Sequence, residues 1–217
     1  MDLGPTLDRV RVRCGVLAWV LALTSAAAAE PVAYQFTGTV VFVTDGSNST
    51  IDLTNSFSPG QMLHLTMTVE RSTPAGSGGN PSMAFYPNAV TQFGFTIGTY
   101  VCTGDAMNIS TVVNDLTPPG SGTPDDVYDV TFSGLTAPAI GSAQPVGANL
   151  SLIDNDGTAL SSTSLPLVTS IAEFEVRAFD FQFTNGTLQF GLVRATLNDV
   201  ITPVRSESWA YVKAMYR

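Results

Sequence analysis

Residues Ala89–Thr103 (AVTQFGFTIGTYVCT) restrict the chain to β folds, because they predict a hairpin whose apolar face another layer must cover. The first half alternates apolar with polar or small residues, which is typical of a half-buried strand with Phe93, Phe95 and Ile97 on one face. Gly98-Thr99 is a two-residue loop that begins with glycine, as a type II′ turn requires. The register that this loop imposes pairs Ile97 with Tyr100 and Phe95 with Cys102.

A second hairpin is predicted at Phe179–Val193, because Asn185-Gly186 is a strong two-residue turn signal between two apolar runs. A two-residue loop here would pair Phe183 with Leu188, Phe181 with Phe190, and Phe179 with Leu192. All six side chains are apolar and would share one face, so the pattern supports this register.

Further strands follow from the same alternation. In Gln61–Glu70 the alternation places on the inward face Leu63, Leu65, Met67 and Val69. In Pro31–Val43 it gives a shared face to Tyr34, Phe36, Val40 and Phe42. Other expected strands are Met107–Val113, Val127–Phe132, Val146–Ile153 and Ala195–Ile201. We expect loops at Thr44–Gly60, with a short strand near Ile51–Leu53, and at Ser72–Pro87, and one helical turn at Ser170–Phe174. Eight to ten short strands predict an all-β, two-sheet antiparallel β-sandwich, jelly-roll-like.

The N-terminus has the order of a secretory signal peptide. Basic residues at Arg9, Arg11 and Arg13 precede an apolar run, Gly15–Leu23, and a small-residue site at Ala27–Ala29. We therefore expect residues 1–29 to form a signal-peptide helix that is removed, residues 30–201 to form the β-sandwich domain, and residues 202–217 to form a C-terminal tail, either short and amphipathic or disordered. The apolar run is shorter than the roughly 20 residues of a membrane-spanning helix, so the mature chain has no predicted stable transmembrane segment.

The charge of the chain disfavours some partners. Loss of three Arg and two Asp with the signal peptide changes the formal net charge from −9 to −10. Such acidity disfavours nucleic acid and anionic lipid, both of which need Lys and Arg. Cys102 is the only cysteine of the mature chain and is expected on the apolar face as a buried, inert thiol. His64, the only histidine, is expected on the polar face of its strand.

The sequence has none of the motifs of common catalytic sites, such as G-x-S-x-G, H-E-x-x-H, C-x-x-C or a P-loop. A glycosidase would need two carboxylates across a cleft, and the sequence alone brings no pair together. The carboxylates considered for this role are Glu70, Asp125, Asp126, Asp129, Glu173 and Glu175. We expect a protein that is not an enzyme.

One short segment resembles a metal loop. Asp154 and Asp156 alternate with Asn155 before Gly157, and oxygen ligands at alternate positions with a glycine for the bend are typical of calcium loops. No acidic residue follows at the twelfth position, which favours an Asx-type turn at the end of a strand. Calcium is thus the one cofactor that the sequence raises, with Asp154 and Asp156 as its candidate ligands.

The order of these segments resembles a known family. YQFTGTVVFV, the FSPGQ turn into LHLTMTVE, the YPNAVTQFGFTIGTY hairpin and the DGTALSSTSLPL connection are similar to exported β-rich proteins of Gram-negative bacteria that carry a PEP-CTERM sorting tag. The similarity runs from about Tyr34 to about Leu197. It implies sorting by an exosortase to the envelope and exopolysaccharide, although Pro-Glu-Pro and the apolar span of the tag are absent here.

Two functions remain open from the sequence. The first is an exported, non-enzymatic protein of the cell envelope or extracellular matrix, periplasmic or extracellular, with a structural or adhesive role and with polysaccharide or envelope proteins as partners. The alternative is a carbohydrate-binding module or, less favoured, a carbohydrate-active enzyme. Its candidate sugar-stacking aromatics are Tyr86, Tyr100, Tyr128 and Trp209.

Overall fold

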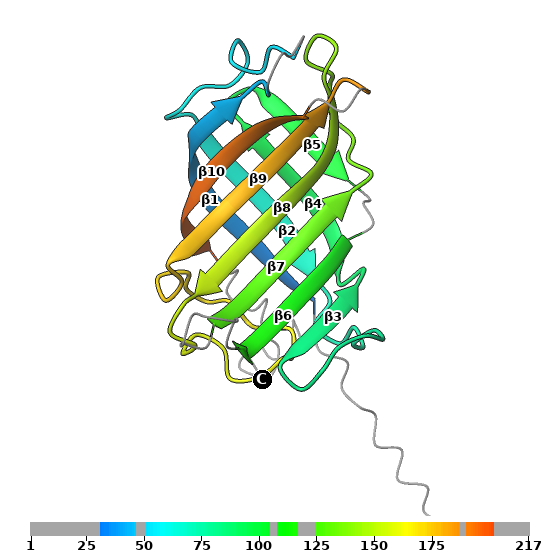
Figure 1. Ribbon diagram of the computed structural model, residues 1–217, viewed down its shortest axis with the longest axis vertical. Coiled ribbons are helices and arrows are strands. Elements are labelled where there is room, and N and C mark those ends of the chain that lie inside the picture. The colour runs from blue at the N-terminus through cyan, green and yellow to red at the C-terminus, as the bar shows by residue number, and fades with distance from the viewer. Residues whose placement is uncertain (1–30, 47–50, 105–107, 117–124, 187–189, 202–217) are drawn as a thin grey trace, which may run out of the picture.

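The computed structural model describes residues 31–46, 51–104, 108–116, 125–186 and 190–201. The predicted signal peptide, the C-terminal tail and Trp209 therefore lie outside the described residues. All the regular structure in the described part is β (Figure 1). The strands are β1 (Val32–Thr44), β2 (Met62–Val69), β3 (Met83–Pro87), β4 (Val90–Ile97), β5 (Tyr100–Gly104), β6 (Asn108–Leu116), β7 (Asp125–Ser133), β8 (Gln144–Asp154), β9 (Val176–Thr184) and β10 (Phe190–Ile201).

The ten strands form one antiparallel sheet in the order β3-β6-β7-β8-β9-β10-β1-β2-β4-β5. The all-β, antiparallel prediction is therefore confirmed. The division into two sheets is not confirmed, because β10 pairs with β1 and joins the two halves of the sheet. Most neighbours in the sheet are also neighbours in the chain, and among these pairs the β1–β2 and β8–β9 connections are the long ones.

The sheet curls into a half-barrel, so that its two halves face each other across the core. In Figure 1 the strands β3 and β6–β10 lie in front and cross β1, β2, β4 and β5 behind them. Near the edges of the sheet, the side chain of Asn108 at the start of β6 bonds the backbone of Val90 on β4: its Nδ2 donates to the carbonyl at 2.7 Å, and its Oδ1 accepts from the N–H at 3.0 Å. The amide thus takes the place of a strand partner and helps to hold the two edges together.

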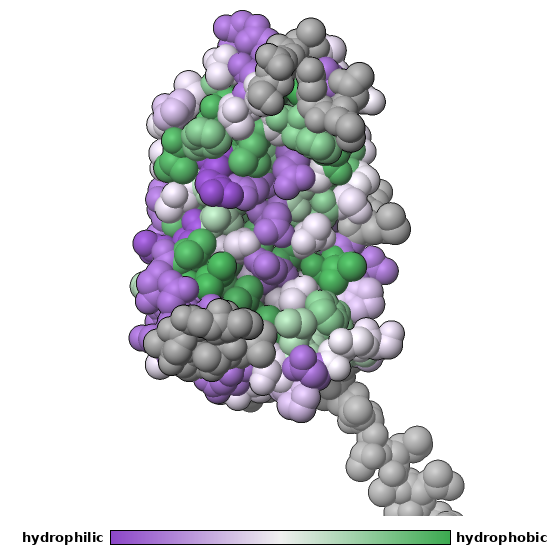
Figure 2. Space-filling view, in the orientation of Figure 1, coloured by the Kyte–Doolittle hydropathy of each residue, from purple (hydrophilic) through white to green (hydrophobic). Residues whose placement is uncertain are grey.

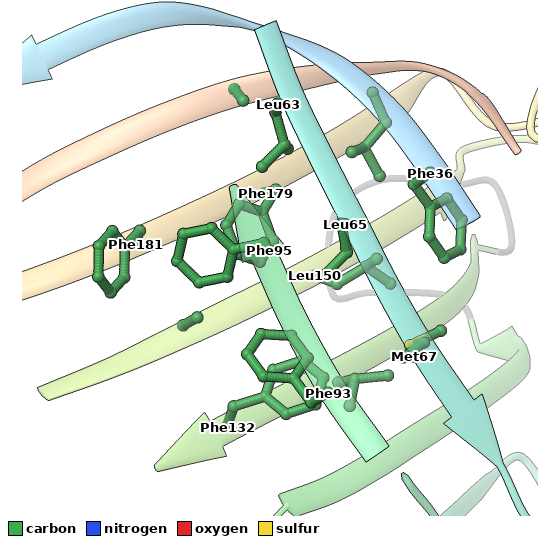
Figure 3. Close-up of a cluster of buried hydrophobic side chains, with 14 of the residues drawn as sticks. Phe36, Leu63, Leu65, Met67, Phe93, Phe95, Phe132, Leu150, Phe179 and Phe181 are labelled. Atoms are coloured by element: carbon green, nitrogen blue, oxygen red, sulfur yellow. The ribbon is translucent and has the colours of Figure 1, made fainter. Parts of the chain in front are cut away.

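Aromatic side chains fill the space between the two halves (Figure 3). Phe93 on β4 stacks on Phe132 of β7 with ring centroids 3.7 Å apart. Phe95 meets Phe179 and Phe181 of β9 edge-on at 4.9 Å and 4.8 Å. Since such ring pairs add stabilisation beyond the area they bury, they favour this packing of one half on the other.

One end of the curled sheet is closed by the connection between β1 and β2. Ile51, Leu53 and Phe57 of this connection are buried, and Phe57 contacts Tyr100 and Phe183 at ring distances of 5.2 Å and 5.9 Å. The connection is fixed by Asp45, whose Oδ1 accepts the N–H of Leu53 at 2.6 Å. The expected short strand near Ile51–Leu53 is absent from the described part of this connection, where these residues instead plug the core.

The opposite end is closed by residues 155–175, which connect β8 to β9. Their buried side chains are Leu165, Val168, Ile171 and Phe174. Two tyrosines from the sheet bind the backbone of this connection: Tyr34 donates to the carbonyl of Pro166 at 3.2 Å, and Tyr86 donates to that of Thr163 at 2.7 Å. The segment Ser170–Phe174, expected as a helical turn, is a bend and turn with one Phe174 N–H to Ile171 carbonyl bond at 3.3 Å.

The first predicted hairpin is confirmed residue by residue. Ile97 pairs with Tyr100 and Phe95 pairs with Cys102. Gly98 has a φ of 57°, as the first position of a type II′ turn requires. The inward face of β2 and the outward place of His64 are also confirmed.

The predicted register of the second hairpin is wrong. Phe183 pairs with Gly191, Phe181 with Val193 and Phe179 with Ala195, and Phe190 lies on the outer face, 57% exposed. The observed register places Gly191 against the plug of the core, where an added Cβ would lie 2.6 Å from Leu53 Cδ1. Glycine leaves room for the Leu53 side chain here, which favours the pairing of Gly191 with Phe183, and the pairing of Thr184 with Phe190 leaves a longer connection in place of the two-residue turn. Leu188 lies outside the described residues.

Two smaller predictions in the sheet are also corrected. Phe42 lies on the outer face, 49% exposed, because β1 has an irregularity between Val40 and Phe42 that reverses the alternation. The segment Ser72–Pro87, expected as a loop, contains β3, whose Ala84 and Tyr86 are buried against the core.

Candidate metal centre

Three carboxylates converge where β8 ends and β9 begins. One oxygen each of Asp154, Asp156 and Glu175 lies within 4.8 Å of the other two. Asp154 is the last residue of β8, and Glu175 directly precedes β9. The pair Ile153 and Val176 is the last of the β8–β9 register, so the residues that follow and precede it meet at the edge of the sheet.

The sequence singled out two of these residues, and the structure brings them together with a third. Glu175, which lies 19 positions after Asp156, was considered in the sequence only as a catalytic carboxylate. Pairing of β8 with β9 was the signal that could have placed it at the metal loop. Periodicity predicts each strand but not which strand it pairs with, so it could not place Glu175 beside Asp156.

Asp154 has a structural role that does not depend on a metal. Asp154 as a whole residue is only 1% exposed. Its Oδ2 accepts the N–H groups of Thr158 at 2.7 Å and Ala159 at 2.8 Å, and its Oδ1 accepts that of Asp156 at 3.1 Å. Burial alone would raise the pKa of Asp154, but these amide donors outweigh it and hold the pKa below its usual value. This is the Asx-type turn that the sequence offered as the alternative to a calcium loop.

The other two carboxylates are exposed and only partly bonded. Asp156 Oδ1 accepts the hydroxyl of Thr158 at 2.7 Å, and Glu175 Oε2 accepts the N–H of Asn155 at 2.9 Å. Calcium takes six to eight oxygen ligands, often including backbone carbonyls and waters. Asp156 and Glu175 each keep one oxygen with which to bind it, while Asp154 would have to share its oxygens with the turn. Calcium binding at Asp154 and Asp156, with Glu175 added, therefore stays a prediction.

A second buried carboxylate lies beside Asp154. Asp126 on β7 is fully buried and is the register partner of Asp154. Its Oδ1 accepts the N–H of Asp115 at 2.9 Å, and its Oδ2 accepts that of Leu160 at 2.6 Å. Asp126 and Asp154 are paired across two strands, but the oxygens of both accept backbone N–H groups, from β6 and from the connection that closes the core. These two carboxylates therefore hold the surrounding backbone in place.

The remaining candidate carboxylates are dispersed. Glu70 accepts hydrogen bonds from the N–H and hydroxyl of Ser72 after β2. Asp129 lies on the outer face of β7, where burial raises its pKa although the Ser151 hydroxyl donates to it. Glu173 lies in the connection between β8 and β9, and Asp125 begins β7. The structure thus leaves these four apart from one another.

The tyrosines considered for sugar stacking belong to the core. Tyr86 and Tyr128 are buried, and Tyr100 is partly buried with its hydroxyl donating to the Pro138 carbonyl at 2.6 Å. Desolvation by burial raises the pKa of Tyr128. Two phenylalanines are the strongly exposed aromatics of the described residues, Phe42 and Phe190.

Cys102 is buried, as expected from its place opposite Phe95. Desolvation raises the pKa of its thiol to about 12, so the reactive thiolate is scarce at neutral pH. Across the described ranges, we find no helix with the length and apolar character to traverse a bilayer. Comparisons of the chain with protein-family models, with curated proteins and with solved structures give no match.

Proposed function

We propose that this chain is an exported, non-enzymatic β protein of the cell envelope or extracellular matrix, with a structural or adhesive role. The observation that supports the proposal is the close packing of the interior over the described residues. Aromatic rings occupy the space between the two halves of the sheet, and an apolar loop closes each end. A carrier of small apolar ligands needs an internal cavity, whereas a scaffold that acts through its surface needs a rigid core.

The outer face of the front half carries both hydrophilic and hydrophobic residues (Figure 2). Hydroxyl, amide and carboxylate groups form a network over β7 and β8: Thr131 donates to Asn149 at 3.0 Å, Asn149 donates to Ser151 at 2.9 Å, and Ser151 donates to Asp129. Arg194 of β10 adds a two-point ion pair with Asp180 of β9, at 2.6 Å and 2.7 Å. Such cross-strand bonds hold polar side chains in fixed positions.

An apolar row crosses the same face nearer the metal loop. Its members are successive register partners on five neighbouring strands: Met83, Val113, Val127, Ile153 and Val176. Alternation along the strands places these side chains on the outer face, where Val176 is 38% exposed, whereas Val113 is buried. Apolar residues left exposed on an outer face often mark surfaces that contact other molecules, so the open end of this row at Val176 supports an adhesive or structural role.

Export is tested by expressing residues 1–217 in a Gram-negative host and sequencing the N-terminus of the purified protein. The proposal expects the protein outside the cytoplasm, beginning at Glu30. A matched variant with Ala27→Leu and Ala29→Leu should keep residues 1–29, because the small-residue site is lost. Recovery of the unsubstituted chain from the cytoplasm with residues 1–29 still present would contradict the proposal.

A further inference from the structure

A groove of about 220 Å³ lies on the connection between β8 and β9, at the closed end of the core. Arg71, which follows β2, forms one side of it. Three serines, Ser161, Ser162 and Ser164, supply hydroxyl groups, and Leu160 and Leu167 add apolar wall. None of the three carboxylates of the metal loop lines the groove, although Asp154 accepts the N–H of Ala159, which does.

The walls of this groove are held by the sheet. Tyr34 and Tyr86 bind the carbonyls of Pro166 and Thr163, and Asp126 binds the N–H of Leu160 at 2.6 Å. Arg71 itself donates from Nε to the carbonyl of Leu165 at 3.3 Å. Because these bonds fix the connection before any ligand arrives, little ordering is needed on binding.

The charge in the groove is that of Arg71. The guanidinium uses its Nε on Leu165, and within the described residues its two terminal nitrogens have no carboxylate partner, in contrast to Arg194 with Asp180. Glu173 lines a neighbouring hollow of about 80 Å³ that shares Leu160 and Leu167 with the groove. An anion is therefore favoured at the Arg71 end and disfavoured at the Glu173 end.

We propose that this groove binds a carboxylate-bearing sugar unit, a uronic acid, with its carboxylate on Arg71 and its hydroxyls on the serines. The planar guanidinium matches a carboxylate, and serine hydroxyls both donate to and accept from sugar hydroxyls. The apolar wall suits the C–H face of the ring. A purely structural role would not need such a ligand. Sugar binding is a property of the purified protein, so the proposal does not depend on whether the chain is exported.

The test is titration calorimetry of the purified protein with short oligomers of galacturonic acid, with neutral glucose oligomers of equal length, and with inorganic phosphate. Binding of the galacturonic oligomers is expected to weaken at least about tenfold in Arg71→Gln, because a charge-assisted hydrogen bond is lost. Arg71→Lys, which keeps the charge but loses the planar fork, should be weakened less. The matched control is Arg194→Gln, which removes the same charge on the outer face and should bind normally.

Each result decides the proposal. Preference for the galacturonic oligomers that depends on Arg71 and not on Arg194 supports it. Equal binding of glucose oligomers, equal binding of phosphate, absence of binding, or an unchanged affinity in Arg71→Gln would overturn it. Thermal unfolding of each variant shows whether it is folded, and Ser161→Ala, at an exposed residue of the lining, gives a second substitution that should weaken binding without unfolding the chain.

Discussion

Asp154→Asn should destabilise the fold strongly for a substitution that changes only one atom. The residue as a whole is 1% exposed, and its carboxylate accepts three backbone N–H groups, from Asp156, Thr158 and Ala159. An Asn side chain keeps one acceptor and turns an NH₂ group toward one or two of these donors. Loss of a charge-assisted hydrogen bond in a buried place costs about 2 to 3 kcal/mol of unfolding free energy. For a domain of this size, that corresponds to a midpoint lower by about 5 to 10 °C.

The pH dependence of this effect separates it from a simple packing defect. The pKa of Asp154 in the folded state lies below the usual value of 3.8. Its contribution to stability is therefore complete above about pH 4 and is lost as the pH falls through the folded-state pKa. Asn does not titrate, so the difference in unfolding midpoint between the unsubstituted protein and Asp154→Asn should shrink between pH 7 and pH 3.

The assay is thermal unfolding followed by circular dichroism in metal-free buffer, with Asp156→Asn as the control. Asp156 is exposed and accepts one hydroxyl bond, so its substitution should change the unfolding free energy by no more than about 0.5 kcal/mol. Equal effects of the two substitutions, or a loss in Asp154→Asn that is the same at pH 3 and pH 7, would refute the anchoring role of Asp154.

Three other predictions concern packing, metal and thiol chemistry. Gly191→Ala should lower the unfolding free energy by about 1 to 3 kcal/mol, because its Cβ would meet Leu53. Adding Leu53→Ala to the same chain should offset part of that loss. If denaturant titrations show that the two substitutions have additive effects, the contact is contradicted. Millimolar calcium should raise the unfolding midpoint, and Glu175→Gln should abolish the increase; an unchanged midpoint would remove the metal site. Since burial raises the pKa of Cys102 to about 12, a maleimide at pH 7 should label the thiol only after unfolding, and rapid labelling of the folded protein would count against a buried site.

Local patterns predicted this fold well where a turn sets the register and less well where distant segments do. Gly98-Thr99 fixed the pairing of Phe95 with Cys102 because a two-residue loop leaves no freedom. Asn185-Gly186 carried an equally strong local signal, but Leu53, 138 positions before Gly191 in the chain, packs where a side chain at position 191 would lie and so favours the pairing of Gly191 with Phe183. The periodicity of apolar residues along the sequence carries no information about such a long-range contact.

The same reasoning could not predict that the ten strands form one continuous sheet. Alternation shows that β1 and β10 each have an apolar face, but it does not show that Thr39 pairs with Thr196. The candidate site follows the same rule: Asp154 and Asp156 are close in the chain and were found, while Glu175 comes to them through the pairing of β8 with β9.

The most direct test of the account is whether β1 and β10 form one continuous sheet. Nuclear Overhauser effects between backbone protons of these strands report the pairing, and the account predicts them between Thr39 and Thr196 and between Phe36 and Val200. Two separate sheets would leave these strands unpaired. Absence of these cross-strand signals, in spectra that do show the β4–β5 pairs, would contradict the single curled sheet.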